Sequence, residues 1–173
     1  PAQFPSAYAV DAVTVPGVFW LNVPGRTNTA NTGSFATIAG TELTGQDVMI
    51  STMFSGCSFA FKQETVGGRV WAAHIMPDDG AGHVVAGAGT GLAQQLAGQV
   101  ATVAAGNFTG STAGNFRVYG AGYSNLAAPL NTGYPVRTTL DEFMNIVGTR
   151  IGGNWQIWSQ YVRGATKTVV RLF

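Results

Sequence analysis

The sequence is short of charged residues and of cysteine. Only 10% of its 173 residues are charged, against roughly 25% in ordinary globular domains. The net charge is +1 and no basic run occurs, so the chain lacks the electrostatic pattern of a nucleic-acid-binding protein. Its single cysteine, Cys57, excludes an internal disulfide. We therefore expect neither a nucleic-acid partner nor a disulfide-rich scaffold.

Long apolar runs are missing as well. Residues 81–116 contain no Asp, Glu, Lys or Arg, but glutamines and glycines interrupt the segment before an apolar run approaches about 18 residues. We therefore expect no membrane-spanning helix. The hydrophobic fraction of 46% and the four tryptophans exclude a disordered chain, and the length predicts a single domain over residues 1–173.

Three β-rich runs surround the cysteine and one of the two histidines. Ser55-Gly56 separates the first run from the second, a turn signal at 65–68 separates the second from the third, and the runs cover residues 48–54, 57–63 and 69–76. The last two runs are therefore predicted to form a β-hairpin.

The turn sets the register of this hairpin. With a four-residue loop, Glu64 pairs with Arg69 and His74 lies opposite Phe59. Cys57 shares a face with Phe59, because side chains alternate along a strand. Cys57 and His74 are then diagonal neighbours within side-chain reach, and a slip of one residue would separate them.

A thiol beside an imidazole is the pair used in nucleophilic acyl transfer. An adjacent imidazolium lowers the cysteine pKa below its usual value of about 8.5, and the histidine can then protonate a leaving amine. The turn at Ser55 and Gly56 would let backbone amides face an oxyanion. The alternative is that Cys57 is a small buried hydrophobe and His74 a core residue.

These residues resemble the cysteine–histidine glutamine deamidases. Toxin members, the cytotoxic necrotizing factor catalytic domains and Burkholderia lethal factor, carry Leu-Ser-Gly-Cys where this chain has Phe54-Ser55-Gly56-Cys57. The chemoreceptor deamidase CheD and its relatives carry Ala-His-Val/Ile-Met-Leu-Pro, which residues 73–77 resemble with one residue missing. The family places a threonine six residues before the cysteine to orient the histidine. That position is Ser51 here, with Thr52 next to it.

The resemblance implies a function and a setting. It implies deamidation of a glutamine in a protein substrate, with catalytic residues Cys57, His74 and Ser51 or Thr52, no cofactor and no metal. It also implies a secreted bacterial toxin or effector that acts in the cytosol of a target cell, or, after CheD, a protein of the bacterial cytoplasm. We expect a monomer.

The rest of the chain predicts an α+β domain. Apolar residues at helical spacing predict a helix over 91–105, and a capping-box pattern at Thr139 predicts a second helix to Gly148. Further strands are expected at 17–23, 35–38, 155–162 and 168–173. The resemblance adds a β-sandwich-like core of mixed sheets flanked by helices.

Three other features suggest weaker hypotheses. Asp78, Asp79, His74 and His83 match no closed zinc or calcium spacing, and the glycines at 87–91 lack the Gly-Lys-Ser/Thr of a phosphate loop. Trp155 and Trp158 are more typical of a core strand than of a sugar site. We interpret these features as a polar turn, a loop and core residues.

Three other functions stay open. A transglutaminase uses the same thiol–imidazole machinery with an amine in place of water. A non-enzymatic β-rich secreted binding module would bury an inert Cys57. A papain-like peptidase is disfavoured, because its cysteine opens a helix and its histidine lies far along the chain.

Overall fold

The structure is a computed structural model of the whole chain. It describes residues 18–20, 27–28, 40–64, 68–75, 77–78, 89–98 and 115–173. Five strands form the first sheet in the order β1-β4-β10-β11-β12. Their bounds are Val18–Trp20 for β1, Val48–Phe54 for β4, Glu142–Ile151 for β10, Asn154–Arg163 for β11 and Thr166–Arg171 for β12. Only the β1–β4 pair is parallel among the described pairs of this sheet.

A second five-stranded sheet is antiparallel and has the order β3-β6-β5-β8-β9. The bounds are Thr41–Glu42 for β3, Ser58–Gln63 for β5, Val70–Ile75 for β6, Phe116–Gly120 for β8 and Tyr123–Ser124 for β9. The remaining elements are the short parallel pair β2 (Thr27–Asn28) and β7 (Pro77–Asp78), the helix α1 (Gly89–Gly98) and the 3₁₀-helix η2 (Leu130–Thr132).

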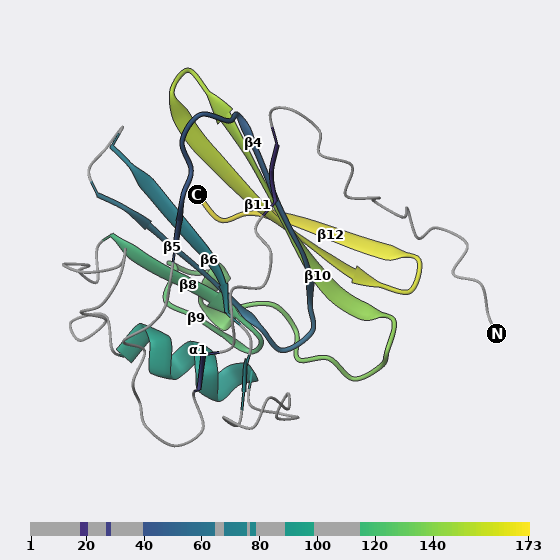
Figure 1. Cartoon of the computed structure of the whole chain (residues 1–173). Coiled ribbons are helices and arrows are strands. Elements are labelled where there is room, and N and C mark those ends of the chain that lie inside the picture. The colour runs from purple at the N-terminus through teal and green to yellow at the C-terminus, as the bar shows by residue number, and fades with distance from the viewer. Residues whose placement is uncertain are drawn as a thin grey trace.

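The two sheets pack on each other, and α1 covers the far side of the second sheet (Figure 1). Alternation along β5 explains these layers, because Phe59 and Phe61 point into the core between the sheets while Ala60 points toward α1. The core between the sheets also includes residues of β4, β10 and β11: Met49, Phe54, Met144, Ile146, Trp155 and Ile157. The small core under α1 includes Ala73, Ile75, Ala93, Leu96, Phe116 and Val118.

The mostly β architecture confirms the predicted sheets, but the second predicted helix is wrong. Residues 142–151 form β10, which pairs with β11 along its whole length and also with β4. The capping-box residues make a turn instead, in which the Glu142 amide donates to the Thr139 carbonyl oxygen. β-Branched residues favour the strand, and Met144 and Ile146 are buried with the period of a strand.

The first predicted helix is confirmed in its N-terminal part. The helix begins at Gly89 and ends at Gly98 within the described residues, with Ala93 and Leu96 buried. The prediction over 99–105 and the strand predicted at 35–38 fall outside the described residues. No described helix has the length and apolarity needed to cross a bilayer.

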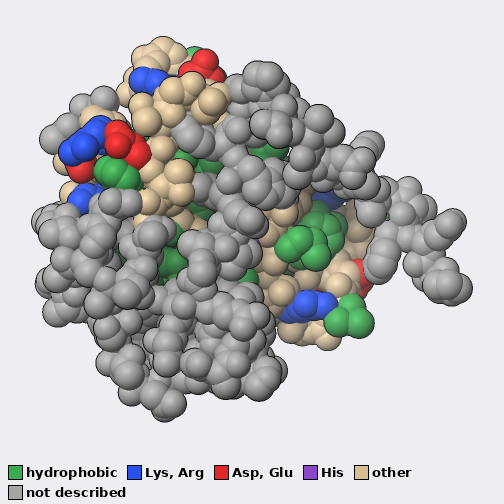
Figure 2. Space-filling model, in the orientation of Figure 1, with side chains coloured by type: hydrophobic (Ala, Val, Ile, Leu, Met, Phe, Trp, Pro, Cys, Tyr) green, Lys and Arg blue, Asp and Glu red, His purple; other side chains and the backbone are tan. Residues whose placement is uncertain are grey.

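The described surface carries scattered charged and apolar side chains (Figure 2). Exposed large apolar residues occur on several elements rather than on one: Met53, Val136, Leu140, Val147, Ile151 and Val169. One of them, Met53, is the only described non-glycine residue with a positive φ, at 66°.

Met53 lies in a β-bulge of β4. The register shifts there, because Phe54 pairs with Met144 and Ser51 with Ile146, so three steps along β4 oppose two along β10. The extra residue lets Ser51 and Phe54 both face the core, although their odd spacing would place them on opposite faces of a regular strand.

Substitution at Met53 should reveal the cost of the bulge. We expect Met53→Gly to raise the free energy of unfolding by up to about 1 kcal/mol, because a left-handed conformation costs an L-residue about 1–2 kcal/mol and glycine's greater freedom in the unfolded chain offsets part of that gain. Met53→Val should lower it by about 1 kcal/mol or more, because a branched side chain tolerates this φ poorly. Urea denaturation of the three proteins measures both changes. Equal stabilities would contradict the assigned backbone conformation.

Candidate active site

The hairpin that carries the candidate pair has the predicted register. His74 pairs with Phe59 between β6 and β5, and the Glu64 amide donates to the Arg69 carbonyl oxygen next to the turn. An ion pair between Arg69 Nε and Glu64 Oε2, 3.0 Å apart, reinforces this end. The register therefore places His74 opposite Phe59, as the sequence predicted, and the structure adds that His74 is buried.

His74 is bound to the opposite sheet through Ser51. Ser51 Oγ lies 3.0 Å from His74 Nδ1, and both side chains are buried. Ser51 is thus the hydroxyl that contacts the imidazole. Thr52, the alternative candidate, lies within the bulge and is half-buried. The structure brings together the histidine and the hydroxyl six residues before the cysteine.

Phe54 contacts the flat face of the same imidazole. The two ring centroids are 3.6 Å apart and the rings lie 10° from parallel. Phe59 in turn meets the Phe54 ring edge-on, with centroids 6.3 Å apart. His74 is therefore held at its edge by Ser51 and on its face by Phe54, two residues of one strand.

Cys57 lies in the link between β4 and β5 and belongs to the core between the sheets, together with Phe54 and Phe59. The Tyr134 hydroxyl donates a 2.6 Å hydrogen bond to the Cys57 carbonyl oxygen. Helix α1 approaches the preceding residue, since a Cβ at position 89 would lie 2.8 Å from the Gly56 carbonyl oxygen. The backbone around the thiol is thus fixed from two distant parts of the chain.

Burial controls the protonation of both groups. It raises the pKa of Cys57 to about 11, although the backbone amides of Ser55 and Cys57 act in the opposite direction by hydrogen-bonding the thiolate. Burial also lowers the pKa of His74 to about 4. The prediction of a thiolate pKa below 8.5 is therefore wrong for this arrangement. Because burial raises the pKa of the thiol and lowers that of the imidazole, both groups are neutral at pH 7 in the resting protein.

Nε2, the second nitrogen of His74, is buried, and no hydrogen bond to it occurs among the described residues, the Cys57 thiol included. An unpartnered buried nitrogen costs about 1–3 kcal/mol, and such atoms are rare enough in proteins to call for an explanation. In the tautomer whose Nδ1–H donates to Ser51 Oγ, Nε2 carries the lone pair of a base.

The weaker candidates contribute little to this site. Trp155 donates from its indole nitrogen to the Leu43 carbonyl oxygen and is buried, as expected of a core residue. Asp79 and His83 fall outside the described residues, and the described part of the chain contains no cluster of three or more His, Cys, Asp or Glu residues placed to hold a metal ion.

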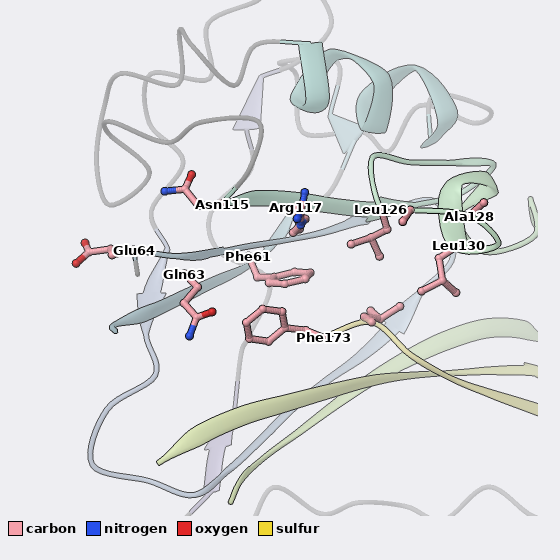
Figure 3. A pocket seen from close by; sticks show the side chains of 11 residues that line it. Phe61, Gln63, Glu64, Asn115, Arg117, Leu126, Ala128, Leu130 and Phe173 are labelled. Atoms are coloured by element: carbon pink, nitrogen blue, oxygen red, sulfur yellow. The ribbon is translucent and has the colours of Figure 1, made fainter. Parts of the chain in front are cut away.

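A separate pocket of about 460 Å³ lies at the other end of β5. Phe61 and Phe173 face each other in it, and Leu126 and Leu130 point toward them (Figure 3). Gln63, Glu64, Asn115 and Arg117 add polar groups. Phe61, the lining residue nearest to Cys57 along β5, is four residues or about 13 Å of extended strand away, and neither Cys57 nor His74 lines the pocket.

Sequence reasoning missed two residues of the site. Phe54 reaches the imidazole only because of the bulge, which no local sequence signal announced. Tyr134 lies 77 residues after Cys57, and only the tertiary fold brings it there. Ser51 was found because the resemblance pointed to its position.

Comparison with known proteins gives no further identification. No family model matches the chain, and no curated protein and no solved structure is significantly similar to it. The functional argument therefore depends on the geometry of the residues themselves.

Proposed function

We propose that this protein is a cysteine-dependent glutamine deamidase, which converts a glutamine side chain of a protein substrate to glutamate. The observation that carries the proposal is the hydrogen bond between Ser51 Oγ and His74 Nδ1, 3.0 Å long. It orients the imidazole so that the unpartnered Nε2 is available as a base. The only thiol of the chain lies at the start of the neighbouring strand.

The reaction would proceed through a thioester. His74 Nε2 takes the thiol proton as the Cys57 sulfur bonds to the carboxamide carbon, and backbone amides near Ser55 and Gly56 stabilise the oxyanion. The imidazolium then protonates the nitrogen, the C–N bond breaks and ammonia leaves. His74 next removes a proton from water, which attacks the thioester and releases glutamate and the thiol. Water is consumed and no cofactor takes part.

The wider assignment follows from the same resemblance. We propose one deamidase-like domain over residues 1–173, with helices flanking the sandwich, acting as a monomer. The resemblance to the toxins supports a secreted bacterial effector that works in a target-cell cytosol, a reducing compartment in which a free thiol stays active. A role in the bacterial cytoplasm is the alternative. A transglutaminase differs only in the acceptor, with an amine in place of water.

The proposal is tested by the mass of the substrate. Purified protein is incubated with extracts of candidate target cells, and glutamines that gain about one dalton are sought by mass spectrometry. We expect such a gain with the wild-type protein and none with Cys57→Ala. An amine adduct instead of the gain would indicate a transglutaminase, and peptide-bond cleavage a peptidase. If no glutamine in any extract gains mass with the wild-type protein beyond what is seen with Cys57→Ala, the proposed enzymatic function is refuted.

Ser51 should contribute through His74. We expect Ser51→Ala to lower kcat/KM about 10- to 100-fold, because without the hydrogen bond to Ser51 the His74 ring is no longer oriented to act as the general base. Thr52→Ala should leave activity within about twofold, because Ser51 makes the contact, and Ser51→Thr should keep most activity. Ammonia release measures all three variants. Equal losses for Ser51→Ala and Thr52→Ala would contradict the assignment.

The neutral resting pair predicts an unusual thiol reactivity. Alkylation of the folded protein by iodoacetamide should keep accelerating about tenfold per pH unit from pH 7 to pH 10, because burial raises the pKa of Cys57 to about 11. In denaturant the rate should level off near pH 9. A plateau below pH 8 in the folded protein would mean instead that the thiolate–imidazolium pair is already formed.

The burial of both groups is the specific observation that favours the rival, a non-enzymatic β-sandwich binding module. Cys57 is 7% exposed and His74 1% exposed, which is also how inert core residues lie. The rival predicts that Cys57→Ala alters stability and leaves every interaction of the protein unchanged. The mass-spectrometric comparison separates the two functions.

A further inference from the structure

Phe54 is placed against the imidazole by a specific backbone device. The bulge at Met53 turns Phe54 to the side on which Ser51 lies, and the Phe54 ring then stacks on His74 with 3.6 Å between centroids. Phe54, the last residue of β4, is followed directly by Ser55, Gly56 and Cys57. One strand therefore supplies both contacts of the imidazole and the approach to the thiol.

We propose that Phe54 is a positioning residue of the active site, which holds the His74 ring in its plane and stabilises the imidazolium that forms when His74 takes the Cys57 proton. This inference rests on the proposed function for its catalytic part. Phe54 exchanges no proton and forms no bond with the substrate.

The two contacts of His74 have different effects. The hydrogen bond to Ser51 fixes one corner of the imidazole but allows rotation about the Nδ1–Oγ direction. A parallel ring at 3.6 Å removes that freedom. The face of a phenyl ring is also electron-rich and attracts a cation, an effect that grows when water is absent.

Among the described residues, Ser51 and Phe54 contact the imidazole ring. The titratable groups that face the same core are the Cys57 thiol, the hydroxyls of Tyr119, Tyr134 and Tyr161, and the Glu142 carboxyl at the end of β10. Glu142 is bound by Thr138 and Arg163. Burial lowers the pKa of His74, and Ser51 Oγ and the Phe54 face are the two contacts that can stabilise its cation.

The test changes the electronics of the ring while keeping its size. Phenylalanine 54 is replaced by pentafluorophenylalanine, whose face repels cations, and Phe54→Leu removes the ring. We expect both changes to lower the His74 pKa by about one unit or more and kcat by about 10- to 30-fold with KM unchanged. NMR of the ring protons follows the pKa. Since the chain has two histidines, His83→Gln assigns the signals.

Phe59→Leu is the matched control. Phe59 is equally buried and touches Phe54 at its edge without stacking on His74, so its loss should destabilise the fold and leave the His74 pKa in place. A pKa that is unchanged in the fluorinated protein, or that moves equally in Phe59→Leu, would overturn the proposal. The pKa needs no substrate. If the wild type releases no ammonia, the proposed function fails, while the NMR comparison still decides whether Phe54 stabilises the cation.

Discussion

The free energy of unfolding should fall by about 3 kcal/mol as the pH is lowered from 6.5 to 4, because of His74 alone. Burial lowers the pKa of this imidazole to about 4 in the folded protein, whereas the unfolded chain has the ordinary value of about 6.5. Between these values the unfolded state binds a proton that the folded state rejects, so acid favours unfolding. The stability is complete above pH 6.5, and the 2.5-unit difference converts to about 3 kcal/mol.

His74→Gln isolates this contribution. The amide can still bond to Ser51 but does not titrate, so its unfolding free energy should change little between pH 6.5 and 4.5. A smaller loss at lower pH should remain from Glu142, whose carboxyl has a lowered pKa chiefly because the Thr138 amide donates to it. Urea denaturation at several pH values measures both proteins. Parallel curves for the wild type and His74→Gln would contradict the buried neutral imidazole.

Gly133→Ala should be the most damaging single substitution among the described glycines. Gly133 has a φ of 66°, and an added Cβ would collide with the backbone of Gly120 and Tyr123. Neither backbone can move without breaking β8 and β9, which pair at this point. We expect a loss of about 4 kcal/mol or more. Because Tyr134 follows directly and binds the Cys57 carbonyl oxygen, the thiol should also become more accessible.

Gly152 provides the matched control for Gly133. It has a similar φ of 57°, but a Cβ there would meet nothing within 4 Å. Gly152→Ala should therefore cost only the conformational strain, about 1–2 kcal/mol. Thermal or urea unfolding distinguishes the two, and the rate of Cys57 alkylation reports on the site. Equal losses for both substitutions would show that the close approach at Gly133 does not limit stability.

The parts of the site that depend on local sequence were predictable. The turn signal that the sequence carries at 65–68 predicted the observed pairing of His74 with Phe59, because register in a hairpin follows from its loop. Residues 142–148 of β10 were wrongly predicted to be helical, because the capping-box pattern at Thr139 is typical of a helix start. Pairing of this segment with β11 and β4 outweighed its local preference for a helix.

The remaining parts depend on tertiary structure. The stack of Phe54 on His74 requires a bulge that forms against β10, about ninety residues later in the chain. The protonation of Cys57 and His74 depends on how deeply the two sheets bury them, which their neighbours in sequence do not determine. The sequence and its resemblance therefore predicted the pairing of His74 with Phe59 and its contact with Ser51. No hydrogen bond joins the Cys57 thiol to His74 Nε2 among the described residues, and the charge of both groups was not predicted.

The extra residue in β4 gives the strand one position that it can lose without changing sides. Removing Met53 would leave Ser51 and Phe54 two residues apart, so that both would still face the core along a regular strand. A deletion earlier in β4, where the pairing is regular, would shift the remaining residues to the opposite side of the sheet. Deletion of Met53 should thus be tolerated better than deletion of a single residue within 48–51.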